Sequence, residues 1–231
     1  MNKGIFVTLE GCEGSGKSTQ SRNIKSVLEK KGKVVTLLRE PGGTALGDRL
    51  RRILKFGDFP LNPASELLLF NASRVQLVEE KIAPSLSRGE VVICDRFTDS
   101  TLAYQGYGRG MSLALIEEIN SVATNNLVPD LTILLDINPE VGMYRNSGKR
   151  DRFEQNFDSE EKKSFHKRVR EGYLQLAKKD FHRWLIIDGE LDTKDVTAKI
   201  LHAIETITVS YTHLRAHETR HDLVCRLLLE K

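Results

Sequence analysis

The sequence is poor in cysteine and has no long hydrophobic run. Its three cysteines, Cys12, Cys94 and Cys225, are far apart and follow no metal-ligand spacing, so neither a disulfide framework nor a zinc site is expected. Nowhere do about eighteen apolar residues run together, as a transmembrane helix would need. The apolar run before Glu10 is also too short for the core of a signal peptide. These absences predict a cytoplasmic protein with no membrane partner.

The sequence also has little excess of charge of either sign. Lys and Arg number 35 against 32 Asp and Glu, which gives a formal net charge of +3. This balance does not require nucleic acid or an anionic membrane as partner, so we expect neither. The sequence has no internal repeat or low-complexity tract. Its 231 residues suffice for one α/β domain with a sizeable core rather than two independent ones.

Five short runs of apolar and β-branched residues predict buried strands. They cover residues 5–9, 34–38, 91–95, 131–137 and 184–188. Helical spacing separates the runs. In residues 19–32, for example, Ile24, Val27 and Leu28 share a face and Gly32 offers a helix C-cap. Strands alternating with helices predict a parallel sheet covered on both faces, with ligands at the carboxyl ends of the strands.

Charged residues stand at the ends of the first four predicted strands. They are Glu10, Arg39, Glu40, Asp95, Arg96 and Asp136. Taken without a motif, any one of them is as consistent with a solvated strand exit as with a functional site.

The stretch "GCEGSGKST", Gly11 to Thr19, contains the phosphate-loop pattern G-x-x-x-x-G-K-[ST]. Glycines at 11, 14 and 16 allow successive backbone N–H groups to face an anion, while Lys17 reaches the outer phosphates and Ser18 offers its hydroxyl to Mg²⁺. The loop follows a predicted strand and precedes a predicted helix, which is the context that the motif requires. We therefore predict a nucleotide site that uses Gly11, Glu13, Gly14, Ser15, Gly16, Lys17, Ser18 and Thr19.

Two further motifs indicate what receives the phosphate. "VVICDRF" places Asp95 at a strand end, where a carboxylate can orient Mg²⁺, with Arg96 beside it to hold a second anion. "FNASRVQ" places Phe70 and Arg74 four residues apart on a predicted helix, so that a nucleobase could stack on the ring and a phosphate could meet the guanidinium. Standing alone, the same pair would be typical of a core Phe and a solvated Arg.

Several motifs together resemble the bacterial thymidylate kinase family from about residue 5 to about residue 205. They are "LEGCEGSGKST", "REPGGT", "LLFNASRVQLVEEKIAPSL", "DRFTDSTLAYQG" followed by "GRG", and "PDLTILLDINPEVG". The resemblance implies transfer of the γ-phosphoryl group of ATP to dTMP, which yields dTDP. It also implies a P-loop kinase fold with a five-stranded parallel sheet, helices on both faces and a mobile lid, and a homodimer.

The resemblance further implies a role for each acceptor-site residue. Glu13 would lie near the 3′-hydroxyl of the acceptor, with Arg39 and Glu40 near its pocket. Phe70 would stack on thymine and Arg74 would contact the base or phosphate region. Arg96 would bind the acceptor phosphate, and Ser100 and Thr101 would read the polar edge of thymine. Tyr104 would exclude a ribose 2′-hydroxyl, and Gln105 follows it.

A basic stretch at about residues 142–157 is the predicted lid. From composition alone it would be a solvated surface. Phosphoryl transfer builds negative charge, however, and the phosphate loop has no Arg of its own, so the cation must come from elsewhere. In the family resembled it comes from this lid. Arg152 is the first candidate and Arg150 the second. Ser18 and Asp95 are the predicted Mg²⁺ ligands.

The sequence leaves three other activities open. The alternatives to thymidylate kinase activity are another P-loop nucleoside kinase, another nucleoside-monophosphate kinase, and a nucleotide-dependent switch ATPase. His166, His182 and His202 are expected to be structural or solvated.

Residues 1–208 are the predicted domain. Residues 209–231 resemble translated sequencing-adapter fragments, so we expect them to be foreign to the enzyme, with a small helical appendage as the alternative.

Overall fold

The structure is a computed structural model that describes residues 4–145 and 159–208. Five parallel strands form one sheet in the order β2-β3-β1-β4-β5. The strands are β1 (Ile5–Glu10), β2 (Val35–Arg39), β3 (Val91–Asp95), β4 (Leu131–Asp136) and β5 (Trp184–Asp188). All five predicted strands are confirmed, with bounds that differ by no more than one residue. The central position of β1 places the phosphate loop between the ends of β3 and β4.

Helices connect the strands, as the alternating pattern predicts. They are α1 (Lys17–Lys30), α2 (Ala45–Phe56), α3 (Pro63–Leu77), α4 (Ala83–Ser87), α5 (Thr98–Thr101), α6 (Leu113–Thr124), α7 (Pro139–Arg145) and α9 (Ser159–Lys179). A last helix covers residues 193–208. Two π-helical segments, η1 (Val78–Ile82) and η2 (Leu102–Gly108), continue α3 and α5.

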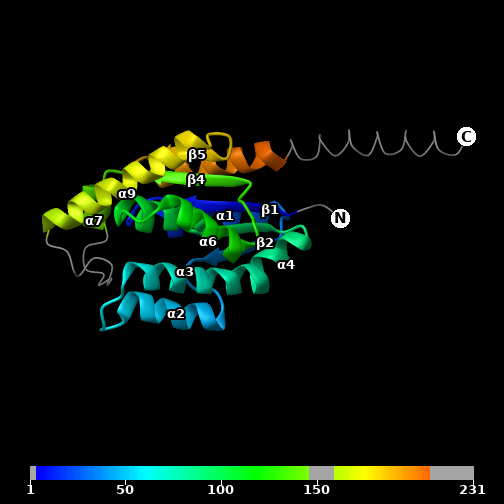
Figure 1. The fold of residues 1–231 in the computed structure, drawn as a ribbon. Coiled ribbons are helices and arrows are strands. Elements are labelled where there is room, and N and C mark those ends of the chain that lie inside the picture. The colour runs from blue at the N-terminus through cyan, green and yellow to red at the C-terminus, as the bar shows by residue number, and fades with distance from the viewer. Residues whose placement is uncertain (1–3, 146–158, 209–231) are drawn as a thin grey trace, which may run out of the picture.

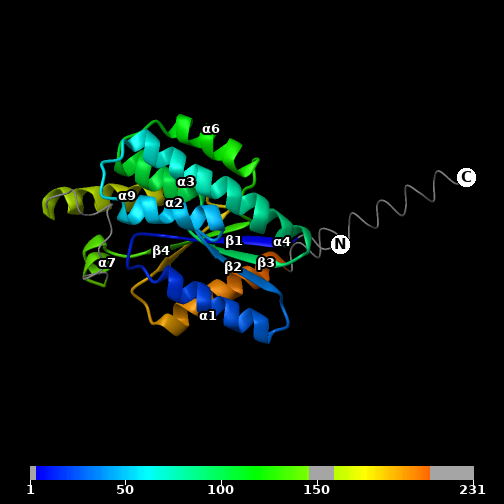
Figure 2. The ribbon, with the colours of Figure 1, turned by 90° about the horizontal axis from the view of Figure 1, so that it is seen from below.

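The helices cover both faces of the sheet (Figure 2). On one face, α1 and the helix of residues 193–208 pack Ile24, Leu28 and Ile200 against strand residues such as Val7 and Ile133. On the other face, α3, α4, α6 and α9 cover the alternate strand residues. Helix α2 packs on α3 and lies farther from the sheet (Figure 1). This three-layer arrangement follows from strands that are apolar on both faces.

Local sequence accounts for the end of α1 and the start of α2. Helix α1 ends at Lys30, and Gly32 beyond it adopts φ 77°, a left-handed conformation suited to glycine. The Thr44 side chain accepts from the Gly47 N–H at 2.9 Å and caps α2. Among the described residues, no helix is both long and apolar enough to cross a membrane.

Candidate active site

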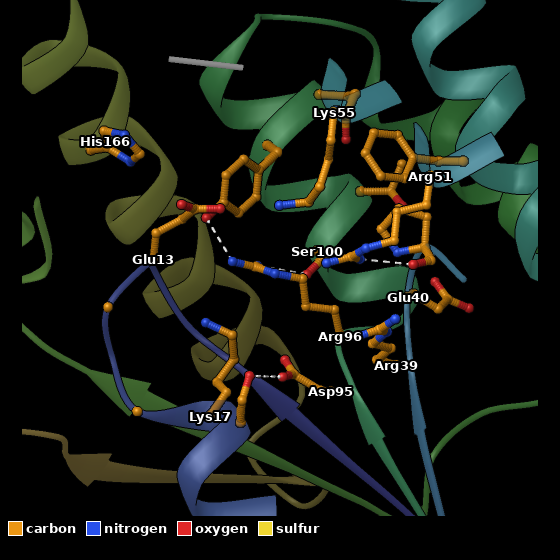
Figure 3. Close-up of a pocket in the computed structure, with 18 of the residues that line it drawn as sticks. Glu13, Lys17, Arg39, Glu40, Arg51, Lys55, Asp95, Arg96, Ser100 and His166 are labelled. Carbon is orange, nitrogen blue, oxygen red and sulfur yellow. Dashed lines mark hydrogen bonds between the residues drawn. The ribbon is translucent and has the colours of Figure 1, made fainter. Parts of the chain in front are cut away.

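A cavity of about 800 Å³ opens at the carboxyl ends of the strands (Figure 3). Most predicted site residues line it: Glu13, Gly14, Gly16, Lys17, Ser18, Thr19, Arg39, Glu40, Phe70, Arg74, Asp95, Arg96, Ser100, Thr101, Tyr104 and Gln105. Gly11 and Ser15 lie in the same loop but not on the cavity wall. Arg150 and Arg152 lie outside the described residues. The cavity therefore joins the phosphate loop to the predicted acceptor residues in one space.

The phosphate loop leaves room for a ligand at one glycine and packs tightly at another. Gly16, the N-cap of α1, has φ 95°, and a Cβ built there would meet no atom within 4 Å. A Cβ on Gly14 would lie 2.3 Å from the Gly142 carbonyl oxygen, so the loop packs backbone to backbone on α7. The N-terminus of α1, with its outward N–H groups and positive dipole end, faces the cavity and suits an anion.

Lys17 is folded back onto the loop. Its buried Nζ donates to the carbonyl oxygens of Gly11 at 2.9 Å and Cys12 at 2.8 Å, and to Ser15 Oγ at 3.2 Å. Burial, followed by repulsion from Arg96, lowers the pKa of Lys17 to about 8. A bound phosphate would favour the charged ammonium, so the loop holds this Lys ready for an anion.

Ser18 and Asp95 meet across the floor of the cavity. Ser18 Oγ donates to Asp95 Oδ2 at 2.6 Å, which brings a hydroxyl and a carboxylate oxygen together at the head of α1. Oxygen donors of this kind fit Mg²⁺, which takes one or two protein ligands and completes its shell with substrate phosphates and water. No cluster of three or more His, Cys, Asp or Glu suited to a metal occurs among residues 4–145 and 159–208. The donor set thus fits a metal that arrives with a nucleotide.

Arg96 has an unusual backbone and a crowded guanidinium. Its φ is 76°, a left-handed conformation that is uncommon for a residue with a Cβ. Its NH1 donates to Ser100 Oγ at 3.1 Å and to the Tyr173 hydroxyl at 3.2 Å. Its NH2 donates to the Tyr104 hydroxyl at 3.1 Å, and the guanidinium lies 4.9 Å from the centre of that ring. Side chains from α5, η2 and α9 therefore fix this cation in the cavity wall.

Glu10, at the end of β1, is fully buried rather than a solvated strand exit. It accepts from the Phe97 N–H at 2.7 Å, from Ser100 Oγ at 2.6 Å and from the Tyr173 hydroxyl at 2.8 Å. Burial, and then the nearby negative charge of Asp99, raises the pKa of Glu10 to about 7. This carboxylate lies directly behind the side chains that hold Arg96.

Arg74 lines the cavity, but it is only 1% exposed. Its guanidinium donates to two oxygens of Glu40, to Asn71 Oδ1, to Asn120 Oδ1, to the Phe97 carbonyl and to Thr101 Oγ1. Every N–H direction of the guanidinium therefore points to a protein acceptor. The reading of Arg74 as a solvated side chain is wrong. A direct contact with an acceptor nucleotide remains a prediction, and it would need Arg74 to share a donor.

Comparison with known proteins decides the family. A sequence model described as thymidylate kinase matches residues 9–200. A thymidylate kinase of Deinococcus radiodurans is 45% identical over 206 residues, which cover 88% of this chain and 98% of the relative. The chain belongs to the thymidylate kinase family. A thymidylate kinase of Synechococcus sp. (strain JA-3-3Ab) is 49% identical over 196 residues, covering 85% of this chain and 93% of that one.

A solved structure supports the same assignment. A crystal structure of thymidylate kinase from Ehrlichia chaffeensis matches with a TM-score of 0.72 and 35% sequence identity, over 88% of this chain and 99% of that chain. The predicted P-loop kinase fold, with five parallel strands and helices on both faces, is confirmed. The family resemblance that the motifs indicate is also confirmed.

The thymidylate kinase motifs did not reveal every residue of the cavity wall. Six residues outside the quoted motifs and the predicted lid also line it: Arg22, Arg51, Lys55, Phe56, Phe165 and His166. Figure 3 shows Arg51 and Lys55 on the side opposite Lys17 and Asp95. His166, expected to be structural or solvated, is buried and lines the cavity. No spacing signal marks the residues from α2 and α9, because their place depends on which faces of these two helices turn toward the cavity.

One buried carboxylate behind the cavity wall also escaped the sequence analysis. Glu66 Oε1 accepts from Gln105 Nε2 at 2.7 Å, and Arg109 holds the same carboxylate through contacts of 2.9 Å and 2.8 Å. The amide of Gln105 is therefore oriented, with its nitrogen toward Glu66 and α3. These partners are 39 residues apart in the chain, so no local motif connects them.

Proposed function

We infer that this chain is a nucleoside monophosphate kinase that transfers the γ-phosphoryl group of ATP to dTMP and releases dTDP and ADP. One observation carries the inference: a single cavity contains both a phosphate loop and a second group of aromatic and cationic side chains. A switch ATPase needs only the first of these. Phosphoryl transfer needs two anions held in line, and the cavity has the residues for both.

On the donor side, we propose that the phosphate loop and Lys17 bind the phosphates of ATP. The open space at Gly16 and the N-terminus of α1 support this role. Ser18 and Asp95 would hold Mg²⁺, which would neutralise phosphate charge when bound with ATP. No side chain has to act as a strong base, since the acceptor phosphate is already an anion at neutral pH.

On the acceptor side, we propose that Phe70 stacks on thymine and that Arg96 binds the acceptor phosphate. The half-buried ring and the fixed guanidinium both line the cavity. Glu13, Arg39 and Glu40 stand at its border, and Tyr104 narrows it beside Arg96. The hydroxyls of Ser100 and Thr101 already bond Glu10 and Arg74, so contacts with thymine would use their remaining lone pairs.

The cation that meets the transferred phosphoryl group is assigned by proposal to Arg152, with Arg150 as second choice. Both belong to the lid at about residues 142–157. The lid overlaps the described residues only at 142–145, within α7, where Gly142 packs on the phosphate loop. A cation delivered there would stabilise the negative charge of the transition state. Closure of the lid would keep water out of the cavity.

The same proposal includes a homodimer in the cytoplasm. Helices α3 and α6 pack side by side, and each presents two exposed apolar side chains seven residues apart: Leu68 and Val75, Leu115 and Val122. An apolar face of this kind is typical of a self-association surface.

The acceptor panel is the direct test of the function. With ATP and Mg²⁺, ADP release should depend on added acceptor, and kcat/KM should be highest for dTMP among dTMP, dUMP, dCMP, dAMP and dGMP. A preference for a purine acceptor would overturn the substrate and keep the reaction class. Equal ADP release with and without any acceptor would instead indicate a switch ATPase.

We also propose that the functional domain ends near residue 208. The family match ends at residue 200, and Val196, Ile200 and Ile204 of the last described helix pack into the core. Truncation after Thr208 should therefore leave the melting temperature and kcat nearly unchanged. Truncation after residue 192, which removes these core contacts, should prevent stable folding. Severe loss of activity in the longer variant would show that residues 209–231 belong to the enzyme.

A further inference from the structure

A buried network connects the end of β1 to the proposed phosphate-binding Arg96. Three hydroxyls surround the guanidinium: Ser100, Tyr104 and Tyr173. Two of these, Ser100 and Tyr173, also reach one oxygen of Glu10, at 2.6 Å and 2.8 Å. Glu10 itself is not on the cavity wall. Those two hydroxyls therefore connect Glu10 to the guanidinium of Arg96.

The direction of the hydrogen bonds gives Glu10 a specific effect. When Glu10 is ionised, its carboxylate can only accept, so the Ser100 and Tyr173 hydroxyls then donate their hydrogens toward it. Their oxygen lone pairs are then left for the N–H groups of Arg96, which can only donate. A group that donates at the Glu10 position would reverse one or both hydroxyls. Arg96 would then face hydrogens instead of lone pairs.

Glu10 also supports the backbone beside Arg96. Its second oxygen accepts from the Phe97 N–H at 2.7 Å, directly after the left-handed Arg96. The Arg96 N–H is itself held by the Leu9 carbonyl oxygen at 3.0 Å. An unfavourable φ persists only where its surroundings fix it. The end of β1 thus fixes both the main chain and the guanidinium of Arg96.

We propose that Glu10 and Tyr173 are positioning residues that hold Arg96 for the acceptor phosphate, with Glu10 setting the direction of the Ser100 and Tyr173 hydroxyls. Neither side chain touches the substrate in this proposal. Tyr173 comes from α9, 163 residues after Glu10 in the chain, so the position of α9 contributes to the acceptor site. The proposal rests on the acceptor role of Arg96 given above.

A double-mutant cycle tests it. Tyr173→Phe removes one hydroxyl and keeps the ring, and Glu10→Gln keeps the shape but introduces a donor. Each should lower kcat/KM for dTMP about tenfold, the factor expected from losing one hydrogen bond to a charged group, with KM for ATP changed less than threefold. In an Arg96→Ala background, the same substitutions should change kcat/KM for dTMP less than twofold, because there is no guanidinium left to position.

Ser85→Ala is the matched control for lost stability. Ser85 is a buried hydroxyl that bonds Thr36 at 3.2 Å, near the amino ends of the strands and away from the cavity. Ser85→Ala should leave kcat/KM for dTMP unchanged at a temperature where Ser85→Ala and Tyr173→Phe are both folded. Equal losses from Tyr173→Phe with and without Arg96 would overturn the proposal, as would no loss in either background. An unchanged KM for dTMP in Arg96→Ala alone would instead overturn the acceptor role of Arg96. If Glu10→Gln does not fold, Tyr173→Phe decides the question.

Discussion

Replacing Lys17 by Met is expected to lower kcat by at least about 10²- to 10³-fold, the cost of removing one preorganised donor from developing negative charge. The structure holds the Lys17 ammonium on three oxygens of the phosphate loop, at the floor of the cavity. Met has similar length and no N–H donor, so it keeps the packing and loses the charge. The measurement is ADP release at saturating ATP and dTMP.

The control for Lys17→Met is the binding of dTMP in the proposed acceptor half of the cavity. Lys17 lies on the proposed donor side, so the dissociation constant for dTMP, measured by calorimetry without ATP, should change less than about threefold. The melting temperature should also stay close to that of the wild type. Loss of dTMP binding together with a large fall in melting temperature would mean that Lys17 chiefly maintains the loop, and the donor role would be withdrawn.

The fold was predictable because its signals are local. A buried parallel strand reads as a short apolar run, and the five runs of this chain coincide with β1 to β5. The phosphate loop was predictable for a related reason: its chemistry is carried by backbone N–H groups, and the glycines that expose them are adjacent in sequence. Gly14 and Gly16 do adopt the left-handed conformations that this chemistry needs.

The residues that α9 adds to the cavity wall were not predictable, because their positions depend on tertiary packing. Helix α9 is amphipathic along its length, and its sequence alone does not say that Phe165 and His166 face the site while Tyr173 reaches Glu10. Most interaction partners of Arg74 are equally remote. Glu40 and Asn120 lie 34 and 46 residues away in the chain. The motif "FNASR" therefore predicted that Arg74 belongs to the cavity. It did not predict that the N–H groups of its guanidinium are already hydrogen-bonded to protein acceptors.

The buried pair of Arg74 and Glu40 leads to a prediction about stability. Arg74→Ala should lower the free energy of unfolding by about 3–5 kcal/mol, the cost of leaving one partner of a buried ion pair uncompensated. Arg74 and Glu40 are 1% and 3% exposed, with NH2 and Oε2 2.7 Å apart, and burial already raises the pKa of Glu40. Urea unfolding of the wild type and the variant gives this difference directly.

A second ion pair of the chain makes the comparison specific. Arg88 and Glu90 are also bonded, at 2.6 Å, but the Arg88 side chain is 58% exposed, so Arg88→Ala should cost less than about 1 kcal/mol. If Arg74 served only to contact the acceptor, Arg74→Ala would resemble Arg88→Ala in unfolding and differ from it only by a higher KM for dTMP. That result would contradict the structural role. A double variant, Glu40→Gln with Arg74→Met, should recover part of the lost stability, because it removes the uncompensated charge. Under the predicted contact of Arg74 with the acceptor, the same variant should not recover dTMP binding.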